Sequence, residues 1–531
     1  MPLTRRALLS SATGTAAAAG SGWAAPTAAR PAPPNILVLM TDQQRPDSLG
    51  CYGSEVAITP NIDRLARDGV RFENCYVQNP LCCPSRYSML TGRYPHSHGV
   101  RSNWYAPRPG ETSFGHQFAR AGYSTALIGK MHFTPWQDLF GSGGRIIAES
   151  KFAVNCPDDY EAFLRKRGAS RRRLYDLDSP EYLRNATAVK SELPQELHID
   201  SFVGRSVCEY MRAVREPFCL FASFLSPHNP YDPPEPYDRL FMKAKFPPRN
   251  MYPGEIADKP KEAYNYINQR LKWPNKTDEL THEQLQITNA YYYGTCTLID
   301  DWVGRIVEVL KQHELYRNTV ILYTSDHGDL LGDHGLVYKQ CFYEQSVKVP
   351  LILHAPAMFG SGTVAAPVEG IDIFSTICEL AGAWPGRGRQ GRSLVPLLHR
   401  KAGYTHREAA FSENHFGRMV RYGQFKMVYY PGKPYGELYD LAEDPDERRN
   451  LWDKLDGSPV KRRLKDVLLD WAFASEDPCP LPVRADHFDE SPLEYDMVQG
   501  RTSLCSRQSW CLEALLPLYS GWEFRESGRL R

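Results

Sequence analysis

A vicinal cysteine pair followed by proline, Cys82-Cys83-Pro84, begins the segment of this chain whose residue types could do the most chemistry. Pro84 suits the first turn of a helix, where a missing N–H costs nothing, and Gly92 suits the end of that helix. The segment therefore predicts a short helix with Cys82 just ahead of its N-terminus. Free N–H groups and the positive end of the helix dipole favour an anion there. The alternative for such a pair in a loop is a strained disulfide or two buried thiols.

Four short apolar runs elsewhere in the chain are each followed by polar side chains that could take part in catalysis or bind a metal. Each run has the length and composition of a buried parallel strand. Because the carboxyl ends of parallel strands meet at one edge of an open sheet, we expect these side chains to lie close together. The runs are 34–40, leading to Asp42; 124–128, leading to Lys130 and His132; 219–225, leading to His228; and 319–323, leading to Asp326 and His327.

Helical segments at 59–68 and 290–312 complete an alternation of strands and helices. The predicted fold class is α/β, with a large, mostly parallel central sheet flanked by helices in a catalytic domain over residues 34–398. From about Gly391 the pattern changes to short strands at 419–420, 425–430 and 437–441 and an amphipathic helix at 459–474. This change predicts a smaller C-terminal α+β domain, with an antiparallel sheet and a tail, over residues 399–531.

The composition is that of an ordinary globular protein of 531 residues, with 42% hydrophobic residues and a formal net charge of +1. So small a net charge gives no strong long-range steering, and nucleic acid is therefore not an expected partner. The 13 cysteines are scattered at spacings that fit neither a zinc ribbon nor a zinc finger. Cys505 and Cys511 are the pair that we expect could form a local disulfide.

The N-terminus has the features of an export signal. Thr4-Arg5-Arg6 is followed by a weakly apolar, alanine-rich run to Ala25, which resembles a twin-arginine signal peptide, with a linker to residue 33. An amphipathic or disordered tail is the alternative. No later stretch reaches the ~18 apolar residues that span a bilayer, so no stable membrane anchor is expected. These features predict a secreted or periplasmic protein that uses the twin-arginine translocase.

The segment 82–93 resembles the signature C-x-P-S-R followed by L-T-G-R of formylglycine-dependent type I sulfatases, which belong to the alkaline phosphatase superfamily. The resemblance implies an alkaline phosphatase-like fold and a sulfuric ester hydrolase. It also implies that a formylglycine-generating enzyme oxidises Cys82 to Cα-formylglycine before the chain folds. Leu438-Tyr439-Asp440-Leu441 is similar to the small C-terminal domain of the same family.

The resemblance further implies one divalent metal. Its ligands would be Asp42, Gln43, the converted Cys82, Asp326 and His327. The family commonly has a second aspartate where this chain has Gln43, so the site carries one negative charge fewer. Calcium is the metal that the family implies, and the imidazole and amide ligands leave manganese or magnesium as alternatives.

The same resemblance implies roles for six catalytic residues. A hydroxyl of the hydrated formylglycine attacks sulfur, and Arg86 favours its ionisation. The lysines stabilise the sulfuryl oxygens, one histidine protonates the leaving alcohol and the other takes a proton from the second hydroxyl to expel sulfate. These residues are Cys82, Arg86, Lys130 and Lys339, His228 for the leaving group and His132 for sulfate expulsion. No catalytic position matches His96, His98 or His334, which are expected to be structural.

Two other functions stay open on the sequence. A phosphonate monoester or phosphodiester hydrolase of the same superfamily fits Gln43, and a glycan-binding protein fits an unconverted Cys82. Segments of the chain are similar to N-acetylglucosamine-6-sulfatases and to iduronate-2-sulfatase, so a sulfated carbohydrate is the first expected substrate, before choline sulfate and aryl sulfates. The long loops 133–179 and 230–273 are expected to shape the substrate pocket.

Overall fold

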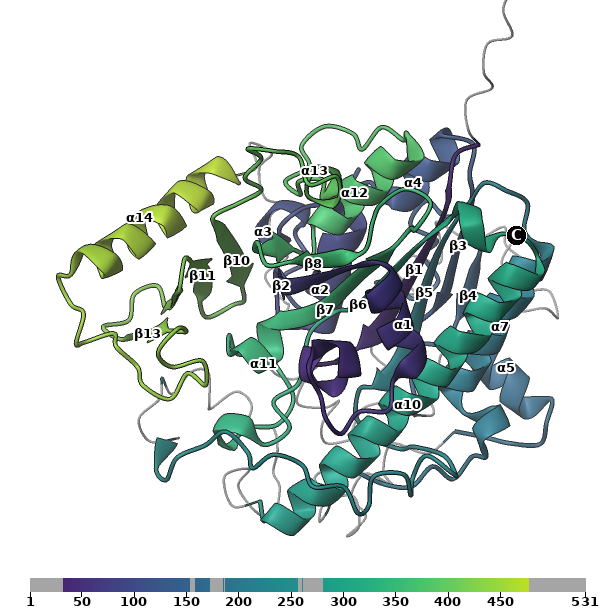
Figure 1. Ribbon diagram of the computed structural model, residues 1–531, viewed down its shortest axis with the longest axis horizontal. Coiled ribbons are helices and arrows are strands. Elements are labelled where there is room, and N and C mark those ends of the chain that lie inside the picture. Colours follow the sequence, from purple (N-terminus) through teal and green to yellow (C-terminus); the bar gives the residue numbers. More distant parts are fainter. Residues whose placement is uncertain are drawn as a thin grey trace, which may run out of the picture. The chain divides into compact units, whose positions relative to one another are not determined.

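A nine-stranded sheet forms the centre of the fold in the computed structural model, which describes residues 32–152, 158–171, 185, 187–255, 260 and 280–476 (Figure 1). The strands run in the order β4 (Arg145–Ile147), β3 (Ser124–Gly129), β5 (Phe218–Pro227), β1 (Asn35–Asp42), β6 (Thr319–Ser325), β7 (Lys348–His354), β2 (Val70–Tyr76) and β8 (Gly362–Val364), and β9 (Val368–Glu369) also pairs with β2.

The five strands from β4 to β6 are all parallel, whereas β7 is antiparallel to both of its neighbours. Leu37 at the centre of β1 lies opposite Leu220 of β5 and Ile321 of β6. Every residue of β1, β5 and β6 is buried, which explains their continuous apolar sequences. The four predicted strands are therefore confirmed, and their carboxyl ends lie along one edge of the sheet.

Helices cover both faces of this sheet, as predicted. Leu37 and Leu39 belong to a core with α1 (Pro60–Asp68), α7 (Ile199–Ala213) and α10 (His282–Gln312). The alternate residues Ile36 and Val38 pack toward α2 (Cys82–Thr91), α4 (Phe114–Arg120) and α12 (Asp372–Ala381). The two-residue period of a strand thus divides the core into two layers.

The long helix α10 begins eight residues before the predicted position 290. Thr281 caps it, because its side chain accepts the N–H of Gln284 while the Gln284 side chain accepts the N–H of Thr281. The two residues of this capping box can be read from the sequence, and they mark the start of α10 at His282.

The remaining helices that the structure describes in the first 398 residues are short and connect the larger elements. They are the α-helices α3 (Pro95–His98), α5 (Asp159–Arg165), α11 (Glu344–Val347) and α13 (Val395–Leu398), and the 3₁₀ helices η1 (Pro46–Ser48), η2 (Gly50–Tyr52), η4 (Gln195–Leu197), η6 (Tyr316–Asn318) and η7 (Asp333–Gly335).

A second, antiparallel sheet follows, as the sequence predicted. It contains β10 (Ala409–Glu413), β11 (Arg418–Tyr422), β12 (Phe425–Tyr429) and β13 (Gly436–Asp440), and α14 (Pro459–Ala474) packs on it through Trp471, which stacks on Phe411. The sequence pattern missed β10, because all five of its residues are buried and give no polar alternation. Arg407, just before β10, pairs with buried Glu369 and Asp372 and so joins this segment to the edge of the large sheet. The proposed domain boundary at residue 398 stays a prediction.

Candidate active site

Helix α2 places Cys82 at the edge where the four strands end. The helix begins at Cys82 itself rather than just after it, and Leu81 is the extended residue before it. Pro84 is thus the third helical residue, which is allowed because all N–H groups of the first turn lack helical partners. Gly92 ends the helix in the left-handed conformation with a φ of 68°, as predicted. Only 1% of Cys82 is exposed, so the side chain lies inside the protein.

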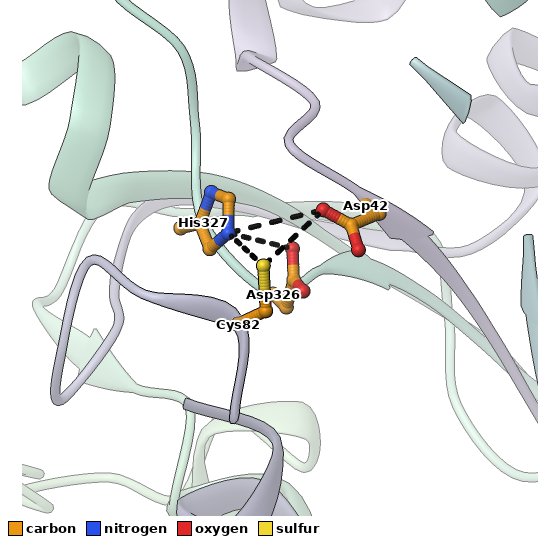
Figure 2. Close-up of side chains that lie close together, drawn as sticks. All are labelled: Asp42, Cys82, Asp326 and His327. Atoms are coloured by element: carbon orange, nitrogen blue, oxygen red, sulfur yellow. Dashed lines mark hydrogen bonds and ion pairs between the residues drawn. The ribbon is translucent and has the colours of Figure 1, made fainter. Parts of the chain in front are cut away.

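Cys82 and three other buried side chains form a cluster, and Figure 2 shows their arrangement. One ligand atom from each of Asp42, Cys82, Asp326 and His327 lies within 4.8 Å of those of the other three. Cys82 Sγ is 3.1 Å from His327 Nε2 and 3.8 Å from Asp42 Oδ1. The residues come from the end of β1, the start of α2 and the end of β6, so the predicted convergence of strand ends is present in the structure.

Arg86 links the two carboxylates of this cluster. Its Nε donates to Asp326 Oδ2 at 2.7 Å, and its Nη2 donates to Asp42 Oδ2 at 3.1 Å. Burial raises the pKa of Asp42, but the charges of Lys130 and Arg86 contribute to holding that pKa well below its usual value. An ionised carboxylate of this kind, a second carboxylate and an imidazole are a donor set that fits a divalent cation.

Two buried lysines create a positive electrostatic environment at Cys82. Lys130 Nζ lies 2.6 Å from Asp42 Oδ2, and although burial lowers its pKa, Asp42 raises it to about 12. Burial and Asp42 raise the pKa of Cys82, yet Lys339, Lys130 and His327 together lower it below the ordinary value. The electrostatic environment at position 82 therefore favours an anion.

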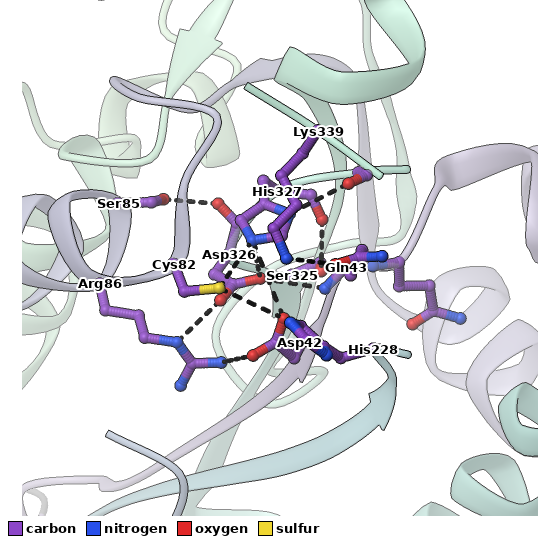
Figure 3. A network of polar contacts seen from close by, with 12 residues as sticks. Asp42, Gln43, Cys82, Ser85, Arg86, His228, Ser325, Asp326, His327 and Lys339 are labelled. Carbon is purple, nitrogen blue, oxygen red and sulfur yellow. Dashed lines mark hydrogen bonds and ion pairs between the residues drawn. The ribbon is translucent and has the colours of Figure 1, made fainter. Parts of the chain in front are cut away.

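Gln43 follows Asp42 in an unusual backbone conformation, with a φ of 72°. Its N–H donates to Asp326 Oδ1 at 3.0 Å, its amide nitrogen donates to Asp329 Oδ2, and its amide oxygen accepts from Lys339 Nζ. Figure 3 shows Gln43 and Lys339 beside the cluster. The amide oxygen that was predicted to bind metal thus faces a lysine, and a metal-ligand role for Gln43 stays a prediction.

Asp329 is a buried member of the site that the sequence reasoning did not single out. Besides the Gln43 amide, it accepts the Tyr231 hydroxyl at 2.6 Å and the N–H groups of Leu331 and Tyr338 at 3.1 and 3.0 Å. Asp329 therefore fixes the loop that leads to Lys339. The only available signal was its place three residues after Asp326 in the same polar motif.

The two predicted catalytic histidines both lie near the cluster. His132 has a φ of 58°, and its ring contacts Trp104 at 5.2 Å between centroids. His228 donates from Nδ1 to the Asn229 carbonyl at 2.6 Å, which leaves Nε2 as the acceptor of the neutral ring. Burial is the main cause that lowers the pKa of both histidines well below the ordinary value.

Glu149 holds the backbone that carries His132. Its two carboxylate oxygens accept the N–H groups of Met131 at 3.0 Å and His132 at 2.9 Å, and Arg145 pairs with it. Glu149 lies in the loop that was expected to shape the pocket, where no pattern distinguished it from other acidic residues.

The histidines expected to be structural are bound away from Cys82. His96 contacts Glu413, His98 contacts Ser88, and His334 contacts Glu255. All nine cysteines in the described part of the chain are free thiols, so the adjacent pair does not form the alternative disulfide. Cys505 and Cys511 lie outside the described residues.

The chain is similar to known proteins over most of its length. The sulfatase family model matches residues 34–383, and the model of the N-sulphoglucosamine sulphohydrolase C-terminal region matches residues 332–473. An arylsulfatase from Clostridium perfringens is 31% identical over 79% of this chain and 90% of that protein. An N-acetylglucosamine-6-O-sulfatase from Bacteroides thetaiotaomicron is 29% identical over 82% of this chain and 85% of that protein. A solved phosphonate monoester hydrolase of Agrobacterium radiobacter matches with a TM-score of 0.74 and 26% identity, over 84% of this chain and 96% of that one.

Proposed function

The chain belongs to the sulfatase family of sulfuric ester hydrolases, and we propose that it releases sulfate from a sulfated carbohydrate through a formylglycine formed at Cys82. The observation that carries the proposal is the position of Cys82 at the first turn of α2, beside a carboxylate–imidazole cluster and facing Lys130 and Lys339. A structural buried thiol does not require charged neighbours, whereas hydrolysis of a sulfate ester requires both groups that bind the anion and an activated nucleophile.

The proposed reaction has two steps. In the first, one hydroxyl of the hydrated formylglycine ionises beside Arg86, with its proton released to solvent, and its oxygen bonds to sulfur. The bond from sulfur to the substrate oxygen breaks, and His228 gives that oxygen a proton. In the second, His132 removes the proton of the other hydroxyl, the bond between carbon and the sulfate oxygen breaks, and sulfate leaves as the aldehyde is restored. Lys130 and Lys339 would hold the sulfuryl oxygens in both steps.

His228 must gain a proton for its proposed role. Burial and the charges of Lys339 and Lys130 lower its pKa in the free site. The negative charge of a bound sulfate ester acts in the opposite direction, so the pKa of His228 should rise when substrate binds.

A divalent metal completes the proposed site. Asp42, Asp326, His327 and the converted residue 82 would hold it, with Gln43 as a further predicted ligand. Calcium is the first candidate, followed by manganese and magnesium. When bound, the cation would supply positive charge beside the sulfuryl group.

Metal removal should reduce both activity and stability. A ligand present at 100 times its dissociation constant stabilises the folded state by about 2.7 kcal/mol, so chelation should lower the melting temperature as well as stop sulfate release. Calorimetric titration of the chelated protein with Ca²⁺, Mn²⁺ and Mg²⁺ identifies the metal. Asp326→Asn should weaken that binding, whereas Asp47→Asn on the surface should not. Unchanged melting temperature and activity after chelation would contradict the metal site.

The substrate is tested by sulfate release from a panel that contains N-acetylglucosamine 6-sulfate, choline sulfate and 4-nitrophenyl sulfate. The similarity to the Bacteroides N-acetylglucosamine-6-O-sulfatase supports the sugar sulfate as the preferred substrate. A higher kcat/KM for the other two esters would contradict the carbohydrate proposal.

Phosphonate monoester hydrolysis is the second candidate. Gln43 and the similarity to the Agrobacterium enzyme favour it. A phenylphosphonate ester belongs in the same panel, and its preferential hydrolysis over every sulfate ester would replace the sulfatase proposal. Binding of a sulfated glycan without hydrolysis, by protein with an intact Cys82 thiol, would instead support the glycan-binding alternative.

We also propose that residues 1–33 direct export through the twin-arginine translocase. Arg5-Arg6 and the alanine-rich run support it, although they lie outside the described residues. Among the described residues, no helix is both long and apolar enough to cross a membrane. Cell fractionation after replacing both arginines by lysine tests the proposal, and export that continues unchanged would contradict it.

A further inference from the structure

The side chain of Lys151 is buried, and its three N–H donors all bind one loop. It donates to the carbonyl oxygens of His228 at 2.8 Å and Pro230 at 2.9 Å, and to Asp232 Oδ1 at 2.8 Å. Its side chain is only 4% exposed. An ammonium group has three donors, so none is left for another partner. Burying a charge is costly unless it is paired. The Lys151 ammonium is paired with the Asp232 carboxylate and with two backbone carbonyls of the loop that carries His228.

The loop from His228 to Asp232 is held at further points on both sides of this clamp. His228 N–H donates to the Leu225 carbonyl at 3.1 Å, and Tyr231 donates through its N–H to Thr187 and through its hydroxyl to Asp329. Among the described residues, Lys151 donates a hydrogen bond from a distant part of the chain to the His228 residue itself. Its hydrogen bond therefore helps to set where the imidazole Nε2 lies relative to Asp42 and Cys82.

We propose that Lys151 is a positioning residue, which holds His228 where its Nε2 can protonate the leaving oxygen of the substrate. This inference rests on the proposed role of His228. A shift of about 1 Å in a catalytic group can cost about 10²-fold in rate, and general acid catalysis contributes about 10²- to 10⁴-fold. A misplaced His228 should therefore lower kcat/KM most for substrates whose leaving group needs a proton.

Two aryl sulfates that differ only in a nitro group separate this role from a general structural one. Phenol is the more basic leaving group, so phenyl sulfate depends on protonation more than 4-nitrophenyl sulfate does. In Lys151→Met, measured as the full chain and normalised to its formylglycine content, kcat/KM should fall about 10²-fold for phenyl sulfate and at least about tenfold less for 4-nitrophenyl sulfate.

The same assay on His228→Ala and on a double variant gives the decisive comparison. His228→Ala should show the same preference for the nitrophenyl ester, and adding Lys151→Met to it should cause no further selective loss. Lys190→Met, which removes a lysine that is 44% exposed and pairs with Glu235 and Asp238, is the matched control and should behave as the wild type. Asp232→Asn keeps an acceptor oxygen for Lys151 and provides a milder variant if Lys151→Met does not fold. The fall in kcat/KM of this variant should also be larger for phenyl sulfate than for 4-nitrophenyl sulfate, and should be smaller than that of Lys151→Met.

The outcomes distinguish the proposed role of Lys151 from the proposed role of His228. Equal losses for both esters in the folded Lys151 or Asp232 variant, or no loss, would overturn the positioning role while leaving that of His228 intact. Absence of leaving-group selectivity in His228→Ala would overturn the proposed acid and, with it, the inference about Lys151. Sulfate release by the wild-type enzyme would still support the sulfatase function in both cases.

Discussion

Replacing Cys82 by alanine should abolish sulfate release. Alanine cannot become formylglycine, so the variant loses both the nucleophile and the second hydroxyl that expels sulfate. Loss of the nucleophile in a well-studied hydrolase costs about 10⁶-fold in kcat, and a loss near the detection limit is expected here. The measurement is sulfate release at saturating substrate by purified, folded protein.

Cys83→Ser is the matched control for this variant. Cys83 is adjacent and equally buried, and its thiol donates to the His132 carbonyl at 3.1 Å, a hydrogen bond that a serine hydroxyl can replace. The control should keep its formylglycine and most of its activity. Retention of more than about a tenth of wild-type activity by Cys82→Ala would overturn the mechanism, because alanine has neither hydroxyl of the formylglycine hydrate.

Replacing Lys339 by alanine should have the second-largest effect. Lys339 is 9% exposed, lies near the Cys82 position and is one of the two lysines proposed to hold the sulfuryl oxygens. Removing one preorganised donor of this kind typically costs about 10²- to 10³-fold in turnover, and that is the expected loss in kcat.

The effect of Lys339→Ala must be separated from a general loss of structure. Lys311→Ala, at a 40% exposed side chain of α10, should keep the wild-type kcat and serves as the control. Melting temperatures of both variants are compared, and the fraction of residue 82 present as formylglycine is measured. A kcat within about tenfold of wild type for a folded, converted Lys339→Ala protein would remove Lys339 from the proposed machinery.

Sequence patterns predicted the parts of the site that follow strands or begin a helix. Asp42, His228 and Asp326 could be placed because each lies at or just after the end of a mostly apolar run that is buried on both faces. Cys82 could be placed because proline and glycine mark the two ends of α2. In these cases, local chemistry and the geometry of a parallel sheet are sufficient.

The residues that hold the site were not predictable in the same way. Glu149, Lys151 and Asp329 act through hydrogen bonds to backbone groups that are distant in sequence or lie in irregular loops. Such partners depend on how two loops meet in space, and neither hydrophobic period nor spacing carries that information. A charged residue in a long loop is usually solvated, and only its burial in the structure distinguishes these three.

Gln43 shows how the structure refines a prediction made from residue type alone. A carboxamide oxygen beside Asp42 is a reasonable metal ligand, but here it accepts a hydrogen bond from Lys339 while Asp329 holds the amide nitrogen. The same residue can therefore orient the lysine that is proposed to bind sulfate. Replacing Gln43 by aspartate would therefore change both the hydrogen bond to Lys339 and one proposed metal ligand.

The most direct test of the account is the mass of the peptide that contains residue 82, measured in enzyme fractions of different specific activity. The account predicts that the fraction of this peptide with an aldehyde in place of the thiol group rises in proportion to the rate of sulfate release. Full activity in protein whose Cys82 is entirely an intact thiol would contradict it.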